Sequence, residues 1–113
     1  MKLPLSDLRV LDLTNVLAGP YCAMVLGDMG ADVIKLENAD KGDTSRQFEP
    51  QVNGESYCFA VLNRNKKSIA LNLQSPQGRE IVMRLVAQCF NSADFTEGRT
   101  AFMEKRKPVF TGR

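Results

Sequence analysis

Histidine and tryptophan are both absent from the 113-residue sequence. Histidine is the commonest general base and the commonest metal ligand, so its absence excludes Ser-His-Asp, Cys-His and HExxH chemistry. The cysteines are odd in number and far apart, which argues against a disulfide framework and against a zinc site, and we expect no metal. Buried thiols in a reducing compartment are predicted at Cys22, Cys58 and Cys89.

Long apolar runs are also missing. No stretch approaches the roughly 18 uninterrupted apolar residues of a membrane span. The first seven residues lack the apolar run of a secretory signal, so we expect a cytoplasmic protein without a membrane partner. The composition, 43% hydrophobic and 25% charged, is typical of a soluble globular chain with room for one small core.

Charge of one sign is not concentrated where a nucleic acid would need it. Residues 1–88 hold ten Lys or Arg against ten Asp or Glu, and residues 89–113 hold five against three. A nucleic-acid site needs a dense basic face with stacking aromatics. The sequence therefore predicts no nucleic-acid partner.

Alternation of apolar and polar residues predicts strands at 7–13, 31–37 and 67–73. A helix is predicted to begin near Gly19-Pro20, and Gly30 supplies the left-handed residue that ends it. A helix between two strands makes a βαβ unit, in which the strands are parallel. The predicted fold class is α/β, with a three-stranded, mostly parallel sheet and helices packed on it.

Residues 38–65 are polar and interrupted by glycine and proline, and we expect a long irregular segment there. Its aromatic patch at 57–59 is a candidate helix. After the third strand, Ser75-Pro76 predicts a helix start. A last helix is predicted at about 94–106, with Asp94 as its cap, and fraying is expected at 111–113.

The turn after the first strand is the first candidate site. Ligands of open α/β sheets bind beyond the carboxyl ends of the strands, where a helix N-terminus offers N–H groups to phosphate. Residues 16–20 are placed to do this. A tight turn from strand to helix also needs a glycine for packing alone, and GxGxxG is absent, so both interpretations stay open at this point.

Two polar segments have two interpretations each. Residues 63–67 hold three cations and two amides, which indicates either a solvated charge cluster or a clamp for an anionic ligand, with Arg64 on a phosphate. Residues 42–46 are either a surface turn or part of a ligand-gating loop. No partner can be identified from the sequence for four carboxylates: Asp12, Asp28, Asp32 and Glu37.

Several segments carry a family resemblance with their spacing intact: 10–14, 16–20, 26–37, Gly42-Asp43, Arg46, 63–73 and 76–79. Over approximately residues 5–88, the chain resembles the N-terminus of the class III CoA-transferases, the CaiB/BaiF and formyl-CoA transferase family. Members of that family move CoA from an acyl-CoA to a carboxylic acid. They fold as interlocked homodimers with a Rossmann-like N-terminal part. The resemblance therefore implies CoA or acyl-CoA as ligand and a homodimer.

The resemblance also implies which residues contact CoA. Val16, Leu17 and Ala18 would line its pantetheine and phosphate end. The adenine would be bordered by Leu71, Asn72, Leu73 and Gln74.

The family mechanism needs an aspartate that attacks the thioester and forms a mixed anhydride. By the resemblance, that aspartate lies downstream of the matched segment, and no aspartate of this sequence corresponds to it. We therefore expect no catalytic residue in this chain and no activity from it alone. Leu17 stands where the formyl-CoA transferases have a glutamine, so their substrate is not implied.

Residues 89–110 resemble something else, the C-terminal tail of an enoyl-CoA hydratase of the crotonase family. By that resemblance, Phe102 and Lys105 would face a CoA ligand, although the crotonase catalytic glutamates are absent. The alternative for the tail is a plain amphipathic helix. The predicted domains are a Rossmann-like part at 1–88 and a helical tail at 89–113.

Three hypotheses follow. The first is a truncated class III CoA-transferase-like protein, inert alone. The second is a non-catalytic CoA-binding or interaction fragment, and the third is an enoyl-CoA hydratase-related fragment. An incomplete Rossmann-like half exposes strand edges and apolar faces, which predicts dimerisation or aggregation.

Overall fold

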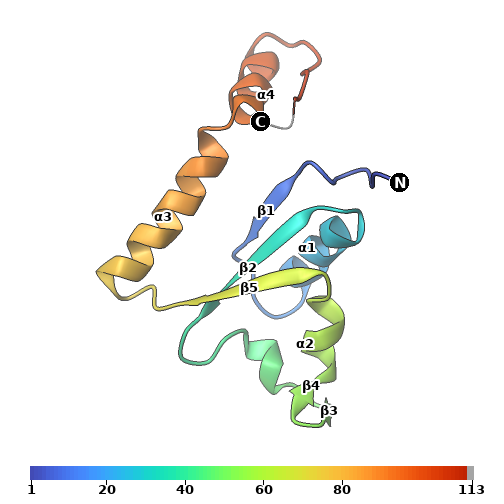
Figure 1. Cartoon of the computed structure of the whole chain (residues 1–113), viewed down its shortest axis with the longest axis vertical. Helices are drawn as coiled ribbons and strands as arrows, with labels where there is room; N and C mark the ends of the chain where they lie inside the picture. The colour runs from blue at the N-terminus through green and yellow to red at the C-terminus, as the bar shows by residue number, and fades with distance from the viewer. Residues whose placement is uncertain (112–113) are drawn as a thin grey trace. The chain divides into compact units, whose positions relative to one another are not determined.

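The computed structural model describes residues 1–111, and the chain divides into two compact units, Met1–Leu73 and Gln74–Arg113. The first unit is built on a three-stranded parallel sheet with the order β1-β2-β5 (Figure 1). Its strands are β1 (Arg9–Asp12), β2 (Asp32–Asn38) and β5 (Lys66–Leu71). The predicted α/β fold with a parallel sheet is confirmed, and both ends of each strand lie within two residues of their predicted positions.

The register fixes where each strand ends. Asp12, the last residue of β1, pairs with Lys35 of β2, whereas Leu71, the last residue of β5, pairs with Asn38. The end of β1 therefore lies three residues, or about 10 Å, short of the end of β5 along the strand direction. This offset leaves a step at the carboxyl edge of the sheet, between two strands that flank β2.

Helix α1 (Ala18–Asp28) connects β1 to β2. A small apolar core of Ala23, Ala31 and Val33 joins the helix to the sheet, and further apolar side chains from β1 and α1 pack against it. The helix ends as predicted at Gly30, whose φ is 105°. Gly30 N donates to Gly27 O (2.9 Å) and Ala31 N to Leu26 O (3.1 Å), the paired bonds of a Schellman motif.

The segment predicted as irregular is more ordered than expected. It holds a 3-10 turn, a two-stranded hairpin and the helix predicted at the aromatic patch: η1 (Thr44–Gln47), β3 (Gln51–Val52), β4 (Glu55–Ser56) and α2 (Tyr57–Leu62). The hairpin turns on Asn53 and Gly54, whose φ angles are 53° and 81°. An Asn-Gly pair is the strongest short-range indication of a hairpin, so this turn is predictable from the sequence.

The second unit consists of two helices, α3 (Pro76–Phe90) and α4 (Ala93–Met103). Ser75 caps α3 as predicted, because its Oγ accepts from Gly78 N at 3.0 Å. Ser92, not Asp94, caps α4. Helix α4 also ends three residues before the predicted 106, since Lys105 takes a φ of 54° and Arg106 N donates to Ala101 O.

Helix α3 runs through residues 88 and 89 without a break. The domain boundary predicted there marks the point where one family resemblance ends and the other begins, and it stays a prediction. Of the residues expected to fray, 112 and 113 lie outside the described residues. None of the helices within residues 1–111 is both long and apolar enough to cross a bilayer.

The prediction of buried thiols is wrong. Cys22 and Cys89 are exposed and Cys58 is half-buried. Both exposed cysteines lie on helices, and neither belongs to the small core that α1 makes with β2. The expected exposure of large apolar side chains is found, for example at Leu13, Tyr57 and Phe102.

Candidate functional site

Two loops meet at the carboxyl edge of the sheet. The loop after β1 contacts the segment after β2 through Val16 N, which donates to Asp43 Oδ1 at 3.2 Å. Asn15 Oδ1 accepts from Thr44 N at 3.1 Å and so adds a second bond between the same loops. The end of β5 is joined to β2 by the bond from Ala39 N to Leu71 O (3.1 Å). Hydrogen bonds therefore connect the loop after β1 to the segment after β2, and that segment to the end of β5, at one edge of the sheet.

The residues predicted for the pantetheine and phosphate end lie at the start of α1. Val16 is half-buried with a φ of 72°, Leu17 is 57% exposed at the N-cap position, and Ala18 is the exposed first residue of the helix. No side chain caps α1, whereas serines cap α2, α3 and α4. The first N–H groups of a helix have no partner within it and carry a partial positive charge. This end of α1 can therefore receive an anion.

The residues predicted to border the adenine are placed differently. Leu71 is the half-buried last residue of β5, and Asn72 and Leu73 follow it with exposed side chains. Gln74 follows Leu73 in the chain and is the first residue of the second unit. The predicted contact residues 16–18 and 71–73 thus lie at the same edge of the sheet, on opposite sides of β2. Their contact with CoA stays a prediction.

Beneath this edge lies a group of four buried charges, which we call the ion cluster: Asp12, Lys35, Asp43 and Lys66. Each of these side chains is at most 2% exposed. Lys66 Nζ lies 2.9 Å from Asp12 Oδ2, and Lys35 Nζ lies 2.8 Å from Asp43 Oδ2 and 3.9 Å from Asp12 Oδ2. The two ammonium charges balance the two carboxylates, which is what burial of ions requires.

Neutral groups complete the ion cluster. Lys66 Nζ also donates to Pro20 O and to Asn63 Oδ1, both at 2.9 Å. Lys35 Nζ donates to Thr14 O at 2.9 Å, and Asp12 Oδ1 accepts from the Thr14 amide and hydroxyl. Burial raises the pKa of Asp12, but the bonds from Thr14 and Lys66 outweigh it and leave that pKa below its ordinary value. Asp12 is therefore ionised at neutral pH.

The two carboxylate oxygens of Asp43 have different partners. Its Oδ1 accepts from the Ser45 amide (2.8 Å), the Ser45 hydroxyl (2.7 Å) and Val16 N (3.2 Å). Its Oδ2 is buried without a well-aligned hydrogen bond and faces Lys35 Nζ as an ion pair. Burial raises the pKa of Asp43, but Lys35 and the Ser45 bonds outweigh it and lower that pKa to about 2.

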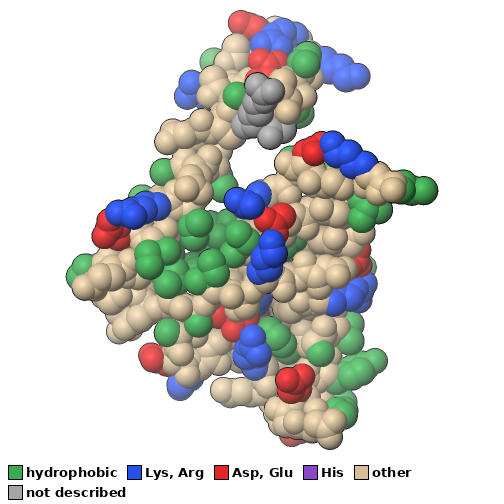
Figure 2. Space-filling view, in the orientation of Figure 1, with side chains coloured by type: hydrophobic (Ala, Val, Ile, Leu, Met, Phe, Trp, Pro, Cys, Tyr) green, Lys and Arg blue, Asp and Glu red, His purple; other side chains and the backbone are tan. Residues whose placement is uncertain are grey.

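The basic segment 63–67 is neither fully solvated nor free to clamp an anion. Lys66 belongs to the buried ion cluster. Arg64 pairs with Asp28 (Nη2 to Oδ2, 2.6 Å), and Lys67 pairs with Asp32 (Nζ to Oδ1, 2.6 Å). On the face shown in Figure 2, basic side chains are interspersed with acidic ones. The structure therefore commits these three cations to carboxylates of the chain itself.

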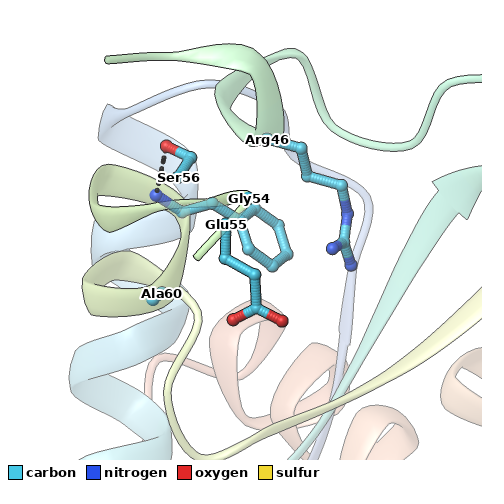
Figure 3. A pocket seen from close by; sticks show the side chains of 6 residues that line it. Arg46, Gly54, Glu55, Ser56 and Ala60 are labelled. Carbon is cyan, nitrogen blue, oxygen red and sulfur yellow. Dashed lines mark hydrogen bonds between the residues drawn. The ribbon is translucent and has the colours of Figure 1, made fainter. Parts of the chain in front are cut away.

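A pocket of about 310 Å³ lies away from the predicted contact residues. Arg46 sits on its wall, paired with Glu37 at 2.9 Å and stacked 3.8 Å from the centre of the Phe59 ring. Figure 3 shows the charged ends of Arg46 and Glu55 pointing the same way. The lining is completed by Gly54, Ser56 and Ala60. Within residues 1–111, no three Cys, Asp or Glu side chains gather as a metal site would need.

Residues 5–89 match the CoA-transferase family III. The chain belongs to CoA-transferase family III. It is 54% identical over 87 residues to the succinyl-CoA:glutarate CoA-transferase of Mus musculus, an alignment that covers 76% of this chain and 20% of that protein. It is 41% identical over 90 residues to the formyl-CoA:oxalate CoA-transferase of Afipia carboxidovorans, covering 79% and 21%.

A solved structure shares the fold. The crystal structure of a CaiB/BaiF family protein from Brucella suis aligns with a TM-score of 0.71 and 41% identity, covering 78% of this chain and 24% of that one. The chain spans about a fifth of the length of the curated family III relatives it matches. The family match contains both predicted contact segments and all four residues of the ion cluster.

Lys66→Met tests the ion cluster. Removing the ammonium leaves Asp12 buried with Lys35 at 3.9 Å and without the closer cation at 2.9 Å, and loss of one partner of a buried pair costs about 3–5 kcal/mol. Lys67→Met, one residue along the same strand, removes an exposed pair and should cost about 1 kcal/mol or less. Urea denaturation of both variants measures the difference. Equal losses would show that the ion cluster does not stabilise the fold.

Acid should weaken the first unit through Asp43. Its pKa is lowered from 3.8 to about 2, so its stabilising contribution is complete above about pH 4 and is lost as the pH falls through 2. Asp12, with a pKa lowered in the same direction, adds to this loss. The urea midpoint should fall between pH 4 and pH 2, and fall less in Asp43→Asn. An identical fall in the variant would contradict the assignment.

Proposed function

We propose that this chain binds the CoA part of acyl-CoA thioesters at the carboxyl edge of its sheet, as a portion of a class III CoA-transferase. One observation carries the proposal: the family match from residue 5 to residue 89 spans both segments that the resemblance assigns to CoA. Relatives with this segment are named as CoA-transferases that use succinyl-CoA or formyl-CoA.

The geometry of the edge supports this ligand. CoA carries phosphates at one end and a long, less polar pantetheine arm at the other. The uncapped start of α1 suits a phosphate, and the exposed apolar side chain of Leu17 suits the arm. The second segment, at Leu71 to Leu73, lies on the far side of β2. An elongated ligand can reach across that separation, whereas a small anion cannot.

Transfer itself needs a carboxylate that attacks the thioester carbonyl, expels the CoA thiolate and becomes a mixed anhydride. The aspartates beneath the edge, Asp12 and Asp43, are buried and held in ion pairs, so neither is available as that nucleophile. The resemblance places the nucleophile beyond the matched segment. We therefore propose that the chain alone binds CoA without transferring it.

Three further expectations belong to this proposal. The tail at 89–110 lies at and beyond the end of the family match, and its likeness to the enoyl-CoA hydratases remains a proposal. The same holds for the homodimer and for a cytoplasmic location. Phe102, which that likeness turns toward CoA, is 81% exposed.

Ala18→Asp separates CoA binding from folding. A carboxylate in the first turn of α1 favours the helix but repels phosphate, so the melting temperature should hold or rise while CoA affinity falls at least tenfold. Asn53→Asp adds the same charge to the β3–β4 turn, where Asp tolerates the left-handed backbone, and should leave affinity unchanged. Calorimetric titration with CoA measures both. Equal affinities in the two variants would place the CoA site elsewhere.

Thioester exchange tests the second half of the proposal. Succinyl-CoA and labelled glutarate, the substrates in the name of one relative, are mixed with the pure chain and glutaryl-CoA is measured by chromatography. We expect no exchange above a protein-free blank, because the aspartates beneath the edge, Asp12 and Asp43, are buried in ion pairs and the resemblance places the nucleophile beyond the matched segment. Sustained turnover would show that a group in this chain serves as the nucleophile.

A further inference from the structure

The loop after β1 holds a residue in a backbone conformation that its side chain disfavours. Val16 has a φ of 72°, and a β-branched residue with positive φ is an outlier that its surroundings must hold in place. Two acceptors do so. Val16 N donates to Asp43 Oδ1 at 3.2 Å and to Asn15 Oδ1 at 3.1 Å. Asn15 belongs to the same loop, and its Oδ1 is shared with Thr44 N, whereas the bond to Asp43 ties Val16 directly to a side chain that is buried in the body of the unit.

Asp43 is itself fixed on every side that the structure shows. Ser45 donates to it through its amide and its hydroxyl, and Lys35 faces its other oxygen at 2.8 Å. Lys35 also donates to Thr14 O at 2.9 Å. The short stretch from Thr14 to Val16 is thus held at both ends by one buried ion pair.

We propose that Asp43 is a positioning residue for CoA, because it holds Val16 in the left-handed conformation that presents Leu17 and the first amides of α1 to the ligand. The inference rests on the proposed function. Asp43 makes no contact with ligand itself, since its side chain is 1% exposed. It acts only through the backbone of the loop.

The consequence of losing Asp43 follows from the strain. Without that acceptor, Val16 relaxes toward negative φ, which any β-branched residue prefers. Leu17 and Ala18 come directly after it, so the start of α1 changes its direction or loses order. Binding then has to restore the strained backbone. The affinity for CoA falls in proportion to the fraction of molecules whose loop already has the conformation that binds CoA.

Calorimetric titration of the full chain with CoA tests this. Asp43→Ala should bind CoA at least tenfold more weakly than the unmodified chain. Ser45→Ala is the matched control, because it removes a hydrogen bond to the same buried carboxylate and leaves the bond from Val16 intact. It should lower the melting temperature and keep the dissociation constant within twofold. A loss of affinity that simply follows the melting temperature in both variants overturns the inference.

A second comparison depends on strain alone. Glycine adopts positive φ without penalty, so a Val16→Gly background should make Asp43 less necessary. In that background, Asp43→Ala should weaken CoA binding less than threefold, against at least tenfold in the unmodified chain. An equal effect in both backgrounds overturns the inference.

Amide exchange keeps the inference testable if Asp43→Ala does not fold. In the unmodified chain without CoA, the Val16 amide should exchange more slowly than the amides of exposed loops, and rapid exchange contradicts a held loop. The failures are distinguishable. If the unmodified chain shows no saturable heat with CoA, the proposed function falls and the inference with it. If it binds CoA and Asp43→Ala binds equally well, only the inference falls.

Discussion

Two buried ion pairs, Lys66 with Asp12 and Lys35 with Asp43, decide how the carboxyl edge of the sheet is built. An unpaired ion in such a place costs several kcal/mol, so the loss of any one of the four side chains leaves a buried charge uncompensated. They come from β1, β2, β5 and the segment before η1. The apolar core of this unit is small. The buried ion pairs therefore fix the positions of the loops above them as much as apolar packing does.

Much of the first unit follows from local sequence patterns. Alternation in 31–37 gives β2, and Gly30 marks the end of α1, because both depend only on neighbouring residues. The ion cluster does not follow in this way. Lys66 and Asp12 are 54 positions apart, and an alternating pattern counts a lysine as a solvent-facing residue. The end of α4 was missed for a related reason, since a lysine at Lys105 takes the place where glycine is expected.

The location of the candidate site can be predicted from the sequence more fully than its individual residues. Its location follows from topology, since parallel strands place their carboxyl ends together. The individual contact residues come from the family resemblance, and their chemistry is ordinary: an apolar side chain, an alanine and backbone amides. Asp43 was missed because it lies in a stretch equally typical of a surface turn. The Asp-x-Ser spacing, which makes an Asx turn, was the indication available.

The proposed function requires the start of α1 and the end of β5 to hold CoA above the ion cluster. Titration of the isotopically labelled chain with CoA, followed residue by residue by NMR, tests it most directly. We expect the largest amide shift changes at Leu17 and Ala18, with further changes at residues 71–73. Changes confined to the pocket beside Arg46, or to α4, would contradict it.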